Sequence, residues 1–239
     1  MTQTRAGRFS RWISNRPATG AQMKFFDPSD PALFVPRRFG SGFSLNTGAV
    51  AVKLGLVRPD DSLDDTAPYL DRRAVTILRW SPVVPLGIVA ATAWRARADG
   101  LSAYPINWNW KTHPTRFAPA WIAFGIPCAI ATIAAAQSLS AGRNNSGTSL
   151  PEPAAAGELT PDTTIDVATP AFCLGEAVTC AGIALATVSS ARRPDEANPA
   201  LVAAIAAGPV AATGAAVWAV RRALNSIAAT LAHDRTSAF

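Results

Sequence analysis

The chain has 239 residues, of which 49% are hydrophobic and only 16% are charged, well below the roughly 25% of a typical soluble domain. Its net charge of +6 is unevenly placed, because charges crowd residues 1–73 and the loops and are nearly missing from four later stretches. This pattern is typical of an integral membrane protein with a basic arm, and no recognised nucleic-acid-binding motif is present. The three cysteines lie in apolar stretches without CxxC spacing, which argues against a disulfide scaffold or a zinc site.

The first 73 residues form a basic arm with 11 Lys and Arg against 7 Asp and Glu. The arm has no apolar core of signal-peptide length, so we expect it to stay in the cytoplasm. Residues 1–21 are predicted to be a flexible basic arm, residues 22–57 an aromatic and basic module, and residues 58–73 a linker. An anionic membrane surface is the favoured partner for the basic charge.

Four apolar stretches follow, each long enough to cross a hydrocarbon core of ~30 Å at about 1.5 Å per residue. They are residues 74–94, 117–139, 170–191 and 200–220. The predicted fold is therefore an all-α membrane protein with four transmembrane helices and a short N-terminal turn–strand module. A flexible loop is expected at 140–169, and the tail, 221–239, is expected either to extend the last helix or to lie on the membrane surface.

The first apolar stretch leaves the topology open, because it contains Arg79, Pro82 and Pro85. With four spans and the N-terminus inside, the basic loop 95–116 faces outside, which conflicts with the positive-inside rule. In a three-span alternative, residues 74–94 form a hairpin that does not cross, and the loop lies inside. Charge favours three spans and length favours four; we expect four.

The segment Phe25–Asn46, FFDPSDPALFVPRRFGSGFSLN, combines five phenylalanines with an arginine pair. Its Asp-Pro pairs favour tight turns, and residues 33–35 are predicted to be extended. The segment resembles a short bacterial module, domain of unknown function 5808, which is usually followed closely by a membrane segment. The positions that carry the resemblance are Asp27, Pro28, Asp30, Pro31, Val35, Pro36, Arg37, Arg38, Phe39, Gly40, Gly42, Phe43, Ser44 and Asn46.

So many aromatic side chains cannot all be buried within so short a unit, so they must dock on the helix bundle, on the membrane surface or on a protein partner. We expect docking or lipid-headgroup contact at the cytoplasmic face, where each arginine would contribute about 1 kcal/mol with lipid phosphates. The residues predicted for this contact are Phe26, Asp27, Asp30, Arg37, Arg38, Phe39, Gly40, Gly42, Phe43 and Asn46.

The loop between the first two spans carries a second resemblance, in YPINWNWKTHPTRFAPAWIAFGIP. Through Tyr104, Pro105, Trp108, Asn109, Pro114 and Arg116 it is similar to the first loop of another bacterial membrane family, domain of unknown function 1648. That family includes an immunity protein against a sporulation-delaying toxin, so the resemblance implies a toxin-immunity-like role. Separately, indole rings favour the headgroup level, which predicts interfacial anchoring by Trp94, Trp108, Trp110 and Trp121.

Two ionisable residues, Arg79 and Glu176, lie inside the predicted spans. In the four-span arrangement both lie about 8–9 Å from the cytoplasmic side. We therefore predict an intramembrane ion pair, the alternative being that each side chain snorkels separately. Gly175 and Gly182 are seven residues apart on one helix face, which predicts close helix packing there.

No catalytic, cofactor-binding or metal-binding motif appears. The two histidines, His113 and His233, lie in a loop and in the tail. The sequence predicts a non-enzymatic plasma-membrane protein for interaction or signalling, with the lipid bilayer and a cytoplasmic protein as partners and no nucleic acid. The alternative is a small transporter or transporter accessory subunit, which Arg79, Glu176 and a proline in every span favour.

Overall fold

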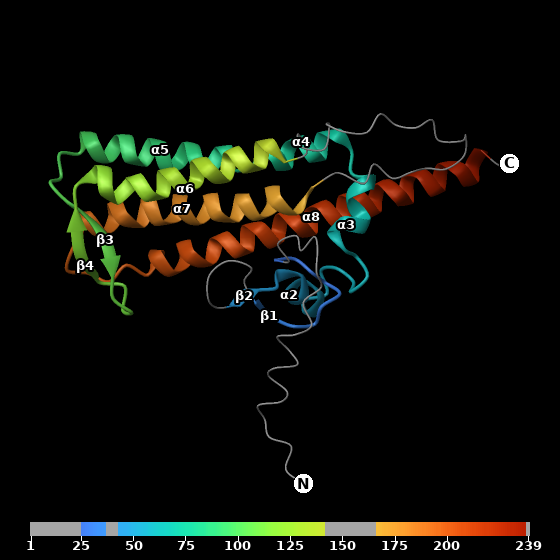
Figure 1. Ribbon diagram of the computed structural model, residues 1–239, viewed down its shortest axis with the longest axis horizontal. Coiled ribbons are helices and arrows are strands. Elements are labelled where there is room, and N and C mark those ends of the chain that lie inside the picture. Colours follow the sequence, from blue (N-terminus) through green and yellow to red (C-terminus); the bar gives the residue numbers. More distant parts are fainter. Residues whose placement is uncertain (1–24, 37–42, 142–165, 238–239) are drawn as a thin grey trace, which may run out of the picture.

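The computed structural model describes residues 25–36, 43–141 and 166–237, and four long helical segments run side by side along its long axis (Figure 1). These segments are α4 (Arg72–Trp80) with α5 (Val83–Ala98), α6 (Ala120–Ser140), α7 (Ala168–Arg192) and α8 (Ala200–Ser237). Each is long and apolar enough to cross a membrane. The predicted helical fold with four membrane-spanning segments and a small strand module is confirmed.

The first span is broken at Ser81 and Pro82, where α4 ends and α5 begins. Proline lacks a backbone N–H and its ring clashes with the preceding helical turn, so the break falls where the sequence requires it. The Ser81 hydroxyl donates to the Leu78 carbonyl at 2.7 Å and closes the last turn of α4. Beyond the break, α5 packs along both α6 and α7. Residues 74–94 therefore do not fold back as the three-span alternative requires.

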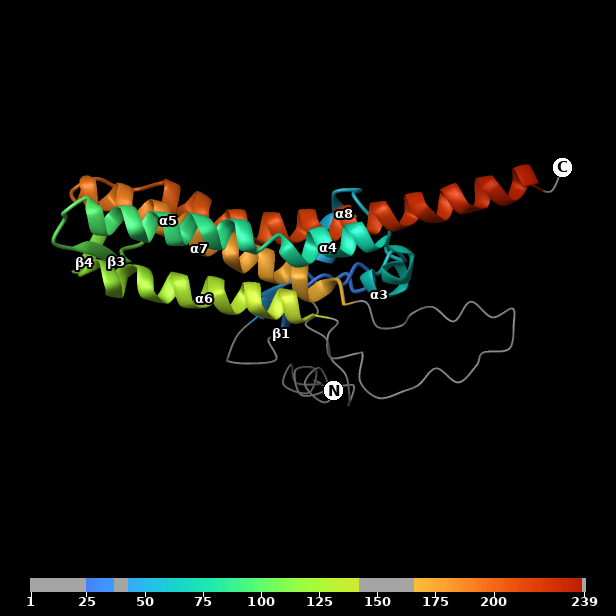
Figure 2. The same cartoon turned by 90° about the horizontal axis from the view of Figure 1, so that it is seen from above.

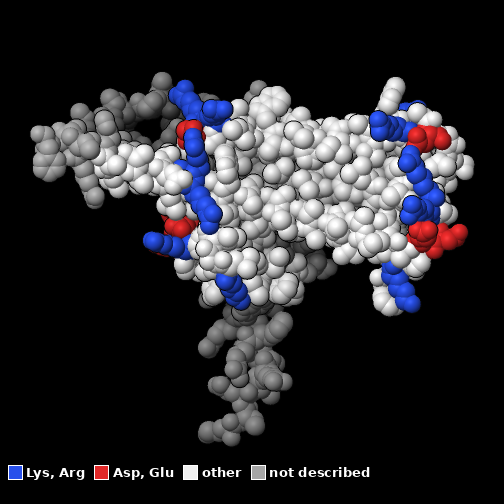
Figure 3. All heavy atoms as spheres, turned by 180° about the vertical axis from the view of Figure 1, so that it is seen from behind, with Lys and Arg blue, Asp and Glu red and all other residues white. Residues whose placement is uncertain are grey.

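On the face shown in Figure 3, charged side chains gather in two bands near the two ends of the bundle, with a surface free of Lys, Arg, Asp and Glu between them. We call that surface the apolar belt. On α8 no charged residue occurs from Ala200 to Val220, a stretch of about 31 Å at about 1.5 Å per residue. This length matches the ~30 Å hydrocarbon core of a bilayer.

The helices α7 and α8 pack closely because small residues line their contact. A Cβ atom added at Gly175 would lie 2.8 Å from the Gly208 carbonyl oxygen, and one added at Gly182 would lie 2.6 Å from Cβ of Ala204. Such distances leave no room for any side chain, so the predicted packing face through Gly175 and Gly182 is confirmed.

The loop between α5 and α6 folds into an antiparallel hairpin of β3 (Tyr104–Trp108) and β4 (Pro114–Ala118), two strands that were not predicted. The Asn109 side chain closes its turn by accepting from the backbone N–H groups of Lys111 (2.9 Å) and His113 (3.0 Å). At its base Tyr104 is fully buried against Phe124, and its hydroxyl donates to the Ala96 carbonyl at 2.6 Å. The hairpin is thereby fixed to the end of α5.

The N-terminal module contains β1 (Phe34–Pro36), β2 (Phe43–Leu45) and α2 (Thr47–Lys53). The predicted turn–strand unit is present, and α2 is an addition that was not predicted. The predicted linker, 58–73, is instead folded in part, as α3 (Leu63–Thr66) and the 3-10 helix η1 (Ala67–Tyr69). Both contact α8, because Leu63, Ala67 and Leu70 bury their side chains in the core there.

Of the two forms expected for the tail, it extends the last helix, since α8 continues to Ser237. The predicted flexible arm, 1–21, and most of the predicted flexible loop, 140–169, lie outside the described residues.

Candidate functional site

Asn46 is the centre of the N-terminal module. Its side chain is fully buried and caps the N-terminus of α2. Its Oδ1 accepts from the backbone N–H groups of Asp27 (2.9 Å), Gly48 (3.1 Å) and Ala49 (3.3 Å). Its Nδ2 donates to the carbonyls of Asp27 (2.8 Å) and Asp30 (3.0 Å). One side chain thus fastens the first turns of the module to the start of α2.

The two aspartates shape these first turns. Oδ1 of Asp27 accepts from the Ser29 backbone N–H at 3.1 Å, and Oδ1 of Asp30 accepts from the Ala32 N–H at 2.9 Å. The turn then lies directly on α2, since a Cβ atom at Gly48 would be 2.5 Å from the Asp27 backbone. The docking or lipid-headgroup contact predicted for Asn46 is not formed by its side chain, which is buried and makes its hydrogen bonds inside the module. Asp27 and Asp30 likewise build its hydrogen-bonded turns.

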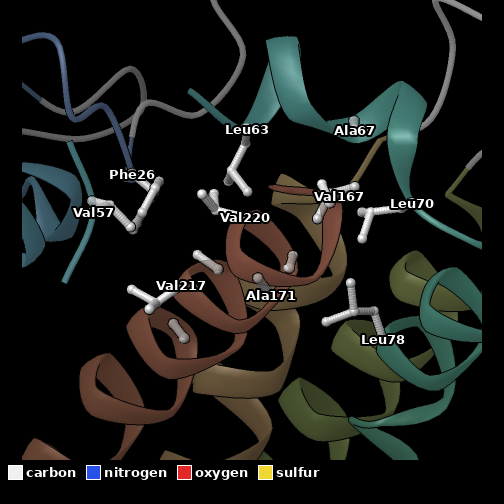
Figure 4. Close-up of a cluster of buried hydrophobic side chains, with 14 of the residues drawn as sticks. Phe26, Val57, Leu63, Ala67, Leu70, Leu78, Val167, Ala171, Val217 and Val220 are labelled. Atoms are coloured by element: carbon white, nitrogen blue, oxygen red, sulfur yellow. The ribbon is translucent and has the colours of Figure 1, made fainter. Parts of the chain in front are cut away.

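Phe25 and Phe26 attach the module to the bundle. Both are buried in one core cluster with residues of α3, α7 and α8. The Phe25 ring lies 5.6 Å, centroid to centroid, from that of Phe172 on α7. Figure 4 shows Phe26 near Val57, with Val217 and Val220 of α8 close by. Of the three docking surfaces expected from the sequence, Phe26 packs on the helix bundle. Its side chain is therefore not available to lipid or to a protein partner.

Other apolar side chains of the module face outward. Phe34 is 63% exposed, Phe43 54% and Leu45 39%. Phe34 pairs with Leu45 across the hairpin, and Pro36 pairs with Phe43. Directly paired residues, and residues two apart on a strand, share one face of a hairpin. The three exposed side chains therefore form one surface, which we call the hairpin face.

The predicted contact residues between β1 and β2 lie outside the described residues. They are Arg37, Arg38, Phe39, Gly40 and Gly42.

The module lies at the side of the bundle rather than beyond its end. Along the long axis, β1 is level with the last turns of α6 and the first turns of α7 in both views (Figures 1 and 2). The last turn of α6 contains Ser138, whose hydroxyl donates to the Arg79 carbonyl at 2.9 Å. This level is therefore the edge of the apolar belt, where the charge band begins.

Two arginines of α8 in this band make an ion pair and hydrogen bonds to the segments before the first span. Arg222 pairs with Asp71 at 3.2 Å, and the other carboxylate oxygen of Asp71 caps α4 by accepting from the Ala74 N–H. The hydrogen bond from Arg222 holds the pKa of Asp71 below its usual value. The guanidinium of Arg221 donates to the Leu56 carbonyl at 3.2 and 3.3 Å. The module, α4 and α8 are thus held as one unit.

The predicted ion pair between Arg79 and Glu176 is not formed in the described part of the chain, where the ion pairs join other residues. Nε of Arg79 is buried without a hydrogen-bond partner. Arg79 belongs to α4, which packs mainly against α6, whereas Glu176 lies half-buried on α7 within the apolar belt. Equal depth alone therefore does not bring the two side chains together.

The four tryptophans predicted to be interfacial anchors lie near the other end of the bundle. Trp94, Trp110 and Trp121 are largely exposed, as side chains that anchor in the lipid headgroups must be. Trp108 differs, because it is partly buried and its Nε1 donates to the Ser190 hydroxyl of α7 at 3.3 Å. Its contact with α7 supports the hairpin of β3 and β4, which the prediction of four equivalent anchors did not anticipate.

A cavity of about 360 Å³ lies at the same end, at the turn from α7 to α8. Its walls include Arg192, Arg193 and Asn198. The two N–H groups of Asn198 Nδ2 are shared among three acceptors, the Ala186 carbonyl (2.9 Å) and the hydroxyls of Ser189 (2.7 Å) and Ser190 (2.8 Å). Arg192 pairs with Asp99 at 2.7 Å. These bonds close the turn, which gives this polar lining a structural role. Across the residues that the structure describes, no group of three or more His, Cys, Asp or Glu is placed to hold a metal ion.

Comparison with known proteins identifies the module alone. A family described as a family of unknown function, domain of unknown function 5808, matches residues 28–53. The match covers the turns, the hairpin and α2, and confirms the first resemblance drawn from the sequence. No curated protein and no solved structure matches the chain. The likeness of residues 104–116 to domain of unknown function 1648 stays a prediction. The four spans and the matched module are consistent with an integral membrane protein.

Proposed function

We propose that this is a non-enzymatic membrane protein that binds a protein partner on the side where the N-terminal module and the end of α8 lie. We further propose that this side is the cytoplasm and that the membrane is the plasma membrane. The basic character of the first 73 residues supports this orientation, since positively charged segments are retained inside.

The observation that carries the proposal is the free end of α8. Ala223 is fully buried, but α8 continues to Ser237, about 21 Å farther. Figures 1 and 2 show this part extending past the rest of the bundle. Leu224 and Leu231 are exposed on it and lie seven residues apart, so they share a face, with Ile227 between them. An apolar stripe on a projecting helix is a common means of binding a partner groove or helix.

The module supports this role because it holds α8 in place. The Arg221–Leu56 and Arg222–Asp71 contacts fix α8 immediately before its free part. A partner bound along the free part is thereby connected to the module and, through the rest of α8, to the other membrane-spanning helices. That connection is what a protein for interaction or signalling requires.

The proposal is tested by photocrosslinking in native membranes. A photoreactive phenylalanine is placed at Leu231 and, as a matched control, at Ala229, which is exposed on the opposite side of the same helix. We expect one discrete protein adduct from position 231 that is absent from position 229 and is lost when Leu224→Asp is added. Equal adducts from both positions, or none from either, would contradict a partner site on this stripe.

Transport is a second candidate, supported by Glu176, a carboxyl side chain inside the apolar belt with no ion pair in the described part of the chain. Ionisable groups at such depth often line ion or proton paths. Reconstituted vesicles would then show a proton or ion flux that Glu176→Gln abolishes and that the exposed-site control Glu196→Gln leaves unchanged. Absence of any flux from the wild-type protein counts against this candidate.

A further inference from the structure

We infer that the hairpin face is a lipid-binding surface, whose side chains Phe34, Phe43 and Leu45 enter the boundary between headgroups and acyl chains. The leaflet is the one on the module side. The basic side chains of the neighbouring charge band bind the phosphates of anionic lipids there.

The division of aromatic side chains within the module is the first support. Phe25 and Phe26 are buried against the bundle, whereas Phe34 and Phe43 are more than half exposed on a unit held rigid by the Asn46 network. The core therefore buries Phe25 and Phe26, whereas Phe34 and Phe43 lie at the surface of the module. Exposed aromatic side chains on a folded, ordered hairpin indicate a surface with something apolar in front of it.

The position of the hairpin decides what lies in front of it. Because β1 is level with the last turns of α6, it lies at the edge of the apolar belt and beside the spans (Figures 1 and 2). A surface at this height that faces away from the bundle meets lipid rather than bulk water. The short strands also leave backbone groups that need water, so side chains enter the interface while the backbone stays at headgroup level.

The neighbouring charges have the sign that this role requires. In Figure 3 the charge band on the module side is mostly blue. Exposed basic side chains of this band come from the end of α2, the following turn, the start of α4 and α8. They are Lys53, Arg58, Arg72 and Arg73, together with Arg221 and Arg222, which also bind the Leu56 carbonyl and Asp71. Basic side chains beside an inserted apolar surface attract anionic lipid headgroups.

The size of the hairpin face argues against a protein occupant. Among the described residues, its three side chains expose roughly 300 Å², less than half of the ~800 Å² that each partner of a standard interface buries. Lipid contact needs no such minimum, because the spans already hold the protein in the membrane. The hairpin face is therefore a lateral anchor that sets the height of the module.

The test uses spin labels in full-length protein reconstituted into phosphatidylcholine vesicles with or without phosphatidylglycerol. In a cysteine-free background (Cys128→Ala, Cys173→Ala and Cys180→Ala), single labels are placed at Phe34→Cys and, independently, Leu45→Cys. Ile133→Cys, exposed on α6 within the apolar belt, is the lipid reference, and Ala232→Cys, exposed on the free part of α8, is the water reference. Access of oxygen and of a nickel chelate to each label gives its depth.

We expect both hairpin labels to favour oxygen and to lie between the two references, deeper when phosphatidylglycerol is present. Labels that match Ala232→Cys would place the hairpin face in water and overturn the inference. Labels protected from both reagents would show that protein covers the face, either another segment of this chain or a second copy, and would overturn it equally. A depth that phosphatidylglycerol does not change would overturn the part that concerns the basic band. Two separate label sites keep the test valid if one variant fails to fold.

Discussion

The buried side-chain amide of Asn46 makes hydrogen bonds to both backbone polar groups of Asp27, nineteen residues earlier in the chain. The oxygen of the amide accepts from the Asp27 N–H while its nitrogen donates to the Asp27 carbonyl. The same oxygen caps α2. Much of the pattern matched by domain of unknown function 5808 is thus explained by the need to fold the module, which leaves the hairpin face as its outward surface.

Replacing Asn46 therefore should loosen the module without unfolding the spans. Asn46→Ala removes the cap and leaves several buried backbone groups unpaired, at a cost of about 2–4 kcal/mol. Asn46→Asp is the sharper variant, since it keeps the capping oxygens but loses the donor to Asp27 and Asp30. Hydrogen exchange of residues 25–57 in detergent should rise for both variants, and should not change for the exposed-site control Asn225→Ala. Unchanged exchange in Asn46→Asp would show that the amide donors do not matter.

The contact between α7 and α8 should tolerate no additional methyl group at Gly182. In Gly182→Ala the new Cβ would lie 2.6 Å from Cβ of Ala204, so the helices must separate. We expect a loss of about 1–3 kcal/mol, as for other overpacked contacts, measured as a lower unfolding temperature in detergent. Gly214→Ala on α8 is the matched control, because no atom lies within 4 Å of its added Cβ. If both variants unfold alike, close packing at Gly182 is refuted.

The Asp71–Arg222 pair gives the junction a dependence on pH. Arg222 lowers the pKa of Asp71 from its usual 3.8, so the native state binds this proton less readily than the unfolded state does. The contribution to stability is complete above the unfolded pKa and is lost as the pH falls through the lowered native value. Wild type should therefore be more stable than Asp71→Asn at pH 7, and the gap should close in strong acid. Asparagine at position 71 keeps the helix cap and removes only the charge. A stability difference that persists in acid would therefore contradict a role for the Asp71–Arg222 ion pair.

Tyr104 should be required for the hairpin of β3 and β4 to remain fixed to α5. Tyr104→Phe keeps the ring against Phe124 but leaves the buried Ala96 carbonyl without its donor, which costs about 1–3 kcal/mol. Burial, with the nearby charge of Asp99, raises the pKa of Tyr104. The wild-type protein should therefore lose stability as the pH rises above about 10, and Tyr104→Phe should lose less over that range. Thermal unfolding against pH for the two proteins measures both effects, and parallel curves would contradict them.

Periodicity and apolar length were enough to predict the spans, because a hydrocarbon core sets the length of each helix. The strand unit also followed from local chemistry, since Asp-Pro pairs specify turns. The helix α2 was missed, although Asn46 before an apolar run is a capping signal. The hairpin of β3 and β4 was missed because its stability comes from Tyr104 packing between helices, which no local pattern shows.

The candidate site was harder to predict than the fold, because burial decides which motif residues remain available. Asn46 and Phe34 belong to the same short segment, yet one is fully buried and the other is mostly exposed. The ion pair of Arg79 and Glu176 failed for a related reason. Depth along a helix can be counted from the sequence, but the neighbour that α4 faces is set by tertiary packing.

The central claim is that the hairpin of β3 and β4 lies on one side of the membrane and the free part of α8, with the module, on the other. Cysteine labelling in intact cells tests it most directly, with single reporters at Asn109→Cys and Ala232→Cys in the cysteine-free background. Four spans with the N-terminus inside predict that Asn109→Cys reacts with an impermeant maleimide in intact cells, and that Ala232→Cys reacts only after permeabilisation. Labelling of both reporters from the same side would contradict the four-span arrangement.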